Sequence, residues 1–259
     1  MGGTSRFVWH DFYAADLAAA KRFYGELFGW SFKPGDHGYE HIAAGGREIG
    51  GMMKLEPQMG APPHWIGYVS VEDVGRAVAA VTQAGGQKYH QEDIPNVGQF
   101  AVCADPQGAV FSPFHSTRQH AGNTEANERP APWTFCWDEL LTADPEAAVR
   151  FYTSVFGWGT EHMDMPDFGR YTLFKRTGVK DEMGADKNAG GVMKLPPGVP
   201  RSFWLTYVAV ENADATVDKA KKLGATPTTP PMDIPHVGRF ATLIDPQRAP
   251  FAVLAPSGR

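Results

Sequence analysis

The stretch FYGELFGW at residues 23–30 returns as FYTSVFGW at residues 151–158, with five of eight residues identical. Two further stretches return in the same order: GGMMKL at 50–55 as GGVMKL at 190–195, and DIPNVGQFAVCADPQG at 93–108 as DIPHVGRFATLIDPQR at 233–248. The offsets are 128, 140 and 140 residues. A constant order with a single change of offset indicates that one module has been duplicated.

The duplication predicts the layout of the chain. The first module is expected to span residues 1–115 and the second residues 133–259, with a polar, proline-ended linker at 116–132. The growth in offset places an insertion of twelve residues between Trp158 and Gly190. We expect this insertion to lengthen a hairpin of the second copy.

Each half of each copy shows the order strand, helix, three strands. In the first copy a strand over 6–13 precedes Asp16, a typical helix N-cap, and the helix that follows ends at Gly29. The second copy repeats this start with Asp144 and Pro145. The sequence therefore predicts an α+β fold of four βαβββ units. They would form two curved, eight-stranded mixed sheets with helices outside, each sheet wrapped around a cavity.

Composition excludes several classes of partner. The chain is 42% hydrophobic and carries a formal net charge of −5, whereas nucleic-acid binding needs a concentrated basic surface. No apolar run approaches the length of about 18 residues that a membrane helix needs, and residues 1–12 lack a signal-peptide pattern. Two cysteines, Cys103 and Cys136, do not make a disulfide framework. A cytoplasmic location is expected.

The helices with FY and FG, together with the turns DPQG at 105–108 and DPQ at 245–247, resemble the hallmarks of the vicinal oxygen chelate superfamily. This superfamily includes glyoxalases, bleomycin-resistance proteins and extradiol dioxygenases. The two-copy arrangement, with WDELL at 137–141, resembles double-module glyoxalase-like or hydroxylase-like proteins of actinobacteria. The resemblance implies the fold more specifically than the reaction, because one fold hosts many functions.

The resemblance also implies where a metal would bind. Metal-using members take His or Gln from the first strand of a module, His from the fifth and Glu from the last. Counting from the shared motifs gives Trp9, Ile66 and Ser112 in the first copy and Trp137, Leu205 and Ala252 in the second. None of these six residues is an imidazole or a carboxylate, so we expect no metal cofactor.

An aromatic pocket is the expected replacement. Tyr68 and Tyr207 share strand parity with Ile66 and Leu205, so their phenols should face the same cavities. A planar ligand could stack on either tryptophan, although these tryptophans could equally fill the sheets as core. The predicted ligand-binding residues are Trp9, His64, Ile66, Tyr68 and Ser112 in the first copy, and Trp137, Leu205, Tyr207 and Ala252 in the second.

Two carboxylates are candidate catalytic residues. Asp11 and Glu139 are equivalent in the repeat and share parity with the two tryptophans. A carboxylate among aromatic side chains should have a raised pKa suited to proton transfer. The alternative is a carboxylate that anchors a loop through backbone amides.

Three functions remain open from the sequence. The leading hypothesis is a monomeric or homodimeric protein that binds a small planar or hydrophobic organic molecule, by sequestration or by metal-free acid–base chemistry. The second is a metal-dependent lyase or dioxygenase with displaced ligands His10, His64 and His115 holding Fe, Zn, Ni or Mn. The third is a protein–protein contact module with both cavities filled.

Overall fold

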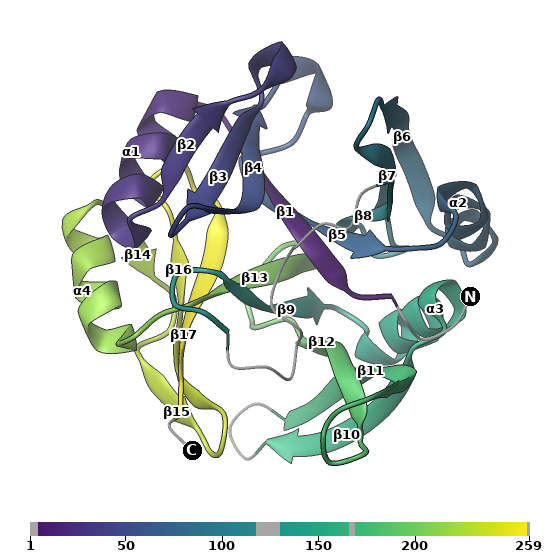
Figure 1. Ribbon diagram of the computed structural model, residues 1–259. Coiled ribbons are helices and arrows are strands. Elements are labelled where there is room, and N and C mark those ends of the chain that lie inside the picture. The colour runs from purple at the N-terminus through teal and green to yellow at the C-terminus, as the bar shows by residue number, and fades with distance from the viewer. Residues whose placement is uncertain (1–4, 118–129, 166–168, 258–259) are drawn as a thin grey trace. The chain divides into compact units, whose positions relative to one another are not determined.

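The computed structural model describes residues 5–117, 130–165 and 169–257 (Figure 1). Most of the predicted linker, residues 118–129, lies outside the described residues. The first copy contains β1 (Phe7–Ala14), α1 (Leu17–Phe28), β2 (Ser31–Pro34), η1 (Asp36–Gly38), β3 (Glu40–Ala44), β4 (Arg47–Lys54), η2 (Pro57–Met59), β5 (His64–Ser70), α2 (Val74–Gln83), β6 (Gln87–Ile94), β7 (Gly98–Ala104) and β8 (Val110–Ser116). The second copy contains β9 (Phe135–Thr142), α3 (Pro145–Phe156), β10 (Gly159–Met165), β11 (Gly169–Lys180), β12 (Asp186–Lys194), β13 (Phe203–Ala209), α4 (Ala213–Lys222), β14 (Thr226–Pro227), β15 (Met232–Ile234), β16 (Gly238–Ile244) and β17 (Pro250–Pro256).

The strands form two mixed sheets, and each sheet is built within one copy. The first has the order β2-β3-β4-β1-β5-β8-β7-β6 and the second β10-β11-β12-β9-β13-β17-β16-β14, with β15 also on β16. The predicted α+β class is confirmed. The second sheet has nine strands instead of the predicted eight, because Pro230 and Pro231 separate β14 from β15 where the first copy has the continuous strand β6. Proline has no N–H to donate to a strand ladder.

The helices of the two FY stretches begin and end as predicted. Asp16 and Asp144 each accept a hydrogen bond from the backbone N–H three residues later. Gly29 and Gly157 end α1 and α3 with φ of 72° and 69°, a left-handed conformation that costs glycine little. The lengthened hairpin is also present, since β11 has 12 residues and its counterpart β3 has 5.

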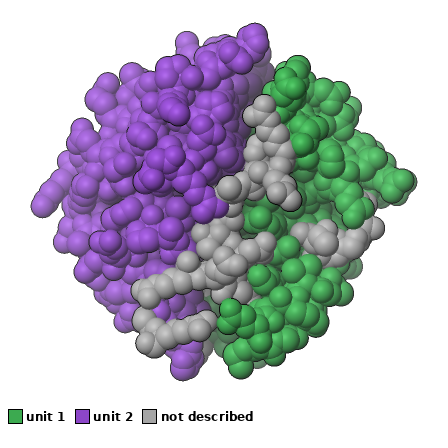
Figure 2. All heavy atoms as spheres, viewed as in Figure 1, with its two compact units in different colours: residues 1–8, 67–121, 138–204 green, residues 9–66, 122–137, 205–259 purple. Residues whose placement is uncertain are grey.

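Contacts divide the chain into two compact units that do not follow the copies. Unit 1 comprises residues 1–8, 67–121 and 138–204, and unit 2 comprises residues 9–66, 122–137 and 205–259 (Figure 2). Each unit therefore takes one half of each copy. In unit 2 the buried face of α1 shares a core with residues of α4, and in unit 1 α3 lies beside α2 (Figure 1).

A hydrogen-bonded clasp joins the two halves of unit 2. Asp245 Oδ1 accepts hydrogen bonds from the N–H groups of Gln247 and Ala249, both at 2.8 Å, while Tyr24 donates its hydroxyl to Asp245 Oδ2 at 3.0 Å. The Gln247 amide bonds both backbone groups of Asp16, at the start of α1, at 2.8 Å. The DPQ turn of the second copy thus binds the FY helix of the first.

Unit 1 repeats the clasp with the copies exchanged. Asp105 accepts from Gln107 N, Ala109 N and the Tyr152 hydroxyl, and the Gln107 amide bonds the backbone of Asp144. In each unit a buried tryptophan also donates to the tyrosine hydroxyl. The two motifs that carry the family resemblance are therefore partners in space.

The clasp carboxylates give a pH-dependent contribution to stability. Burial raises the pKa of Asp245 above its ordinary value of 3.8. Ionising this carboxyl group therefore costs more free energy in the folded protein than in the unfolded chain. As pH rises above 3.8 through the raised pKa, the wild type should lose stability relative to Asp245→Asn, which has no such charge. Urea unfolding of both proteins between acidic and neutral pH measures this difference. A difference that stays constant, or grows in favour of the wild type, contradicts the expectation.

Candidate functional site

Strand β1 divides its side chains between two faces. His10 and Phe12 point toward the helix-packed core of unit 2, where the His10 ring lies 4.2 Å from the Phe135 ring. Because side chains alternate along a strand, Trp9, Asp11 and Tyr13 lie on the other face. The predicted shared parity of Trp9 and Asp11 thus agrees with their direct contact.

Trp9, Asp11 and Tyr39, here called the Trp9 cluster, are hydrogen-bonded to one another. Trp9 Nε1 donates a hydrogen bond to both Asp11 Oδ1 and the Tyr39 hydroxyl oxygen, and each N···O distance is 2.9 Å. Tyr39 donates its own hydroxyl to Asp11 Oδ1 at 2.6 Å. Asp11 is only 4% exposed, whereas Trp9 is half-buried. The cluster therefore fixes the plane of an indole ring that keeps part of its surface accessible.

A glycine makes room for the cluster. Gly51 on β4 pairs with Asp11 on β1, and a Cβ at Gly51 would overlap the Tyr39 hydroxyl and lie 2.6 Å from Asp11 Oδ1. Tyr39 lies directly before β3. Its hydroxyl occupies the space that a side chain at residue 51 would fill, and there it bonds Asp11. Only glycine at residue 51 lets phenol and carboxylate meet here.

Both its geometry and its electrostatic environment make the Tyr39 hydroxyl a hydrogen-bond donor. Burial, followed by the negative charge of Asp11, raises the pKa of Tyr39 well above 10.0. The phenol therefore keeps its proton, and the Asp11 carboxylate accepts from two side chains.

Tyr13 and His64 extend the same face. Their rings stack with centroids 5.2 Å apart and planes 5° from parallel. His64 Nδ1 lies 2.7 Å from the carbonyl oxygen of Pro62, which can only accept, so Nδ1 carries the proton. Burial lowers the pKa of His64 from 6.5, which leaves a neutral ring whose Nε2 is an acceptor.

The second copy keeps one part of this arrangement and lacks the other. Glu139 pairs with Gly191, and a Cβ at Gly191 would overlap the Tyr171 hydroxyl, so Tyr171 lies where Tyr39 lies in the first copy. The positions equivalent to Tyr13 and His64 hold Leu141 and Phe203. Trp137, the counterpart of Trp9, is half-buried and belongs to unit 2.

The remaining predicted pocket residues lie on the inner strands. Tyr68 pairs with Ser112 between β5 and β8, and Tyr207 pairs with Ala252 between β13 and β17. All four are buried, and the Ser112 hydroxyl donates to the carbonyl oxygen of Ala101 at 2.8 Å. Ile66 and Leu205, also buried, precede these tyrosines by two residues. The register agrees with the parity argument, while a role for these residues in ligand binding stays a prediction.

The positions at which the family resemblance implies metal ligands hold residues that do not suit a metal. The Trp9 indole nitrogen is an N–H donor occupied by Asp11 and Tyr39, and the Ser112 hydroxyl is occupied by a backbone carbonyl. Within residues 5–117, 130–165 and 169–257, no three His, Cys, Asp or Glu side chains are grouped so that they could hold a metal ion.

The alternative set of His10, His64 and His115 is not brought together either. The His10 ring packs on Phe135, the His64 ring on Tyr13, and His115 is an exposed residue whose Nδ1 lies 3.1 Å from the Val71 carbonyl oxygen. Each of the three imidazole rings contacts a different neighbour, and the three do not form one site.

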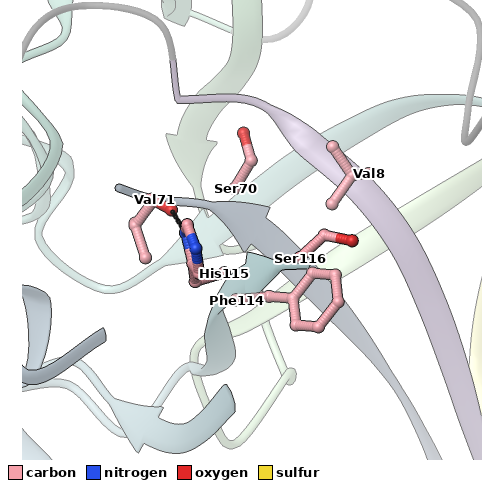
Figure 3. A pocket seen from close by; sticks show the side chains of 6 residues that line it. All are labelled: Val8, Ser70, Val71, Phe114, His115 and Ser116. Carbon is pink, nitrogen blue, oxygen red and sulfur yellow. Dashed lines mark hydrogen bonds between the residues drawn. The ribbon is translucent and has the colours of Figure 1, made fainter. Parts of the chain in front are cut away.

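A small hollow of about 230 Å³ lies at the ends of β1, β5 and β8 in unit 1 (Figure 3). Its lining consists of Val8, Ser70, Val71, Phe114, His115 and Ser116. The predicted site contributes His115 alone to this lining. The hollow is thus distinct from the Trp9 cluster.

Sequence reasoning missed Tyr39, Tyr171 and Tyr13. The first two lie outside the three strands considered as ligand sources, and their contact with β1 spans 28 residues in the first copy. A usable signal was nevertheless present, because Gly51 and Gly191 repeat within GGMMKL and GGVMKL. Glycine retained at a strand interior indicates a close approach by another group.

Family models match both copies of the chain. The model described as a glyoxalase-like domain matches residues 8–113, and the one described as the glyoxalase/bleomycin resistance protein/dioxygenase superfamily matches residues 135–253. The chain is 38% identical over 258 residues to the Mycobacterium tuberculosis protein named "Putative glyoxylase CFP32", covering 96% of this chain and 94% of that protein. The chain belongs to the glyoxalase/bleomycin resistance protein/dioxygenase superfamily. The expected resemblance is thereby confirmed.

Three further proteins are similar to most of the chain. The anthracycline biosynthesis protein DauV of Streptomyces sp. strain C5 is 29% identical over 268 residues, covering 95% of this chain and 92% of its own. Among solved structures, the 2,3-dioxygenase LapB from Pseudomonas sp. KL28 has a TM-score of 0.66 at 12% identity, covering 98% of this chain and 92% of that one. The Mn(II)-bound glyoxalase from Novosphingobium aromaticivorans has a TM-score of 0.61 at 16% identity, covering 96% and 81%. At these identities the two structures show the fold alone. No helix in the described part of this superfamily member is long and apolar enough to cross a membrane.

Proposed function

We propose that this superfamily member binds a small planar or apolar organic molecule against the Trp9 indole, with no metal ion required. The observation that carries the proposal is the fixed indole: Asp11 and Tyr39 hold its N–H while the ring stays half-buried. A ring held in place loses little conformational freedom when a ligand stacks on it, which favours binding. Trp137 offers the equivalent surface in the second copy.

The Asp11–Tyr39 pair supports a second role, metal-free acid–base chemistry. The Asp11 carboxylate, oriented by the hydrogen bonds that it accepts from Tyr39 and Trp9, can take a proton from a bound molecule as a general base. Glu139, paired with Gly191 near Tyr171, would serve the same purpose. Saturable binding without product distinguishes sequestration from this chemistry.

Calorimetric titration with 2-methoxynaphthalene, a planar probe with no hydrogen-bond donor, tests the proposal. We expect Trp9→Ala to weaken binding at least about tenfold, or ~1.4 kcal/mol, because the stacking surface is removed. Trp9→Phe, which keeps a ring but loses the anchoring N–H, should fall between the wild type and Trp9→Ala. Met183→Ala, at a residue 93% exposed, is the control and should bind as the wild type does.

Elemental analysis of the same protein separates the metal-dependent alternative. Binding that persists at sub-stoichiometric Fe, Zn, Ni and Mn supports the proposal. Stoichiometric metal, with binding abolished by a chelator, would overturn metal independence. Equal affinities of the wild type and Trp9→Ala would overturn the role of Trp9.

A further inference from the structure

The two copies differ in one chemically important place on otherwise matching faces. Both have a tryptophan, a carboxylate and a tyrosine at equivalent positions: Trp9, Asp11 and Tyr39 in the first, and Trp137, Glu139 and Tyr171 in the second. Only the first has the stacked pair Tyr13 and His64 beside them. At those two positions the second copy has hydrocarbon side chains.

The exchanged residues match in burial, so the copies differ in chemistry more than in shape. Tyr13 and Leu141 are each 7% exposed, and His64 and Phe203 are both half-buried first residues of β5 and β13. Tyr13 lies on the same face of β1 as Trp9 and Asp11, because side chains alternate along a strand. The stacked pair therefore continues the Trp9 cluster and is not a separate surface feature.

His64 has one hydrogen-bonding atom to offer. Its Nδ1–H is held by the Pro62 carbonyl, and stacking on Tyr13 fixes the ring plane. Among the described residues, no side chain or backbone group forms a hydrogen bond with Nε2. This nitrogen is also not one of the fully buried polar atoms that lack a partner, so it is accessible. A neutral ring in this tautomer presents Nε2 as an acceptor with a fixed direction.

We propose that Tyr13 and His64 form a specificity subsite of the first copy, where His64 Nε2 accepts a hydrogen bond from an O–H or N–H group of an aromatic ligand. Leu141 and Phe203, at the equivalent positions of the second copy, offer no such acceptor. This inference rests on the proposed function, because the subsite selects among molecules that stack on Trp9.

Two probes of the same shape test the subsite. 2-Naphthol carries one O–H donor, and 2-methoxynaphthalene carries none. By calorimetry, we expect the wild type to bind 2-naphthol at least about fivefold more tightly, since one hydrogen bond contributes about 1 kcal/mol net. His64→Phe, which introduces the residue of the second copy, should abolish this preference, so that 2-naphthol and 2-methoxynaphthalene bind with equal affinity.

Matched variants guard against a folding defect. His64→Gln keeps an acceptor oxygen and should restore part of the preference. Each variant is compared with the wild type by thermal unfolding, so that lost binding is not mistaken for lost structure.

The possible outcomes test the subsite separately from the proposed function. Failure of both probes to bind the wild type overturns the proposed function and the subsite together. Binding of both probes with equal affinity, or a preference that survives in His64→Phe, overturns the subsite alone. A preference that disappears in His64→Phe and partly returns in His64→Gln supports it.

Discussion

Asp245→Ala is expected to lower the free energy of unfolding by about 3 kcal/mol or more, because each of three donors that loses its acceptor in a buried site costs about 1–3 kcal/mol. The substitution leaves the N–H groups of Gln247 and Ala249 and the Tyr24 hydroxyl without their acceptor. Asp245 is 3% exposed and Tyr24 is fully buried, so water replaces these bonds poorly. Urea unfolding followed by circular dichroism measures the loss.

Graded controls identify the cause of that loss. Asp245→Asn keeps the oxygen that accepts from the two backbone N–H groups and should cost less than Asp245→Ala. Gln247→Ala removes only the exposed bonds to Asp16 and should cost about 1 kcal/mol or less. Asp105→Ala, the counterpart in unit 1, should behave as Asp245→Ala does. A loss below about 1 kcal/mol for Asp245→Ala would show that the clasp is not a main source of stability.

Gly51→Ala is expected to disrupt the Trp9 cluster and to weaken binding of 2-methoxynaphthalene about as much as Trp9→Phe does, because the ring remains but its anchoring is weakened. The new Cβ would occupy the place of the Tyr39 hydroxyl, so the phenol must leave and the Trp9 N–H loses one of its partners. Overpacking of this kind typically costs about 1–3 kcal/mol of stability. Calorimetry measures binding, and the indole N–H resonance of Trp9 in a ¹⁵N–¹H spectrum reports its hydrogen bonds.

A second change on the same contact tests the steric explanation. Gly51→Ala combined with Tyr39→Ala removes the overlap with Tyr39 but keeps the 2.6 Å approach to Asp11 Oδ1, so it should regain part of the stability without regaining affinity. Gly75→Ala is the control, because Gly75 is exposed on α2 and its Cβ would meet only Asp73 Oδ1, at 3.2 Å. If Gly51→Ala binds the probe normally and the Trp9 resonance does not move, Tyr39 does not hold the indole.

The FY helix and the DPQ turn of one copy belong to different units. Each contacts the motif of the other copy within its own unit. A relative that carries both motifs in both copies is expected to share this pairing.

The sequence by itself determined the features that depend on neighbours along the chain. The repeat gave the two copies and the longer hairpin, the caps Asp16 and Gly29 set the limits of α1, and strand parity placed Trp9 and Asp11 on one face. These follow from local backbone preferences and from the two-residue period of a strand. The proline pair that divides the last edge strand is equally local, although its effect on the strand count was not foreseen.

Only the tertiary structure decided which distant residues meet. Tyr24 bonds Asp245 across 221 residues, and Tyr39 reaches Asp11 across 28 through the gap left at Gly51. The sequence offered Asp11 either as a base or as a loop anchor, whereas its observed partners are the side chains of Trp9 and Tyr39. Such contacts depend on how whole sheets and helices pack, and no periodicity along the chain encodes them. The candidate site is therefore a product of packing, built on a face that the sequence had already indicated.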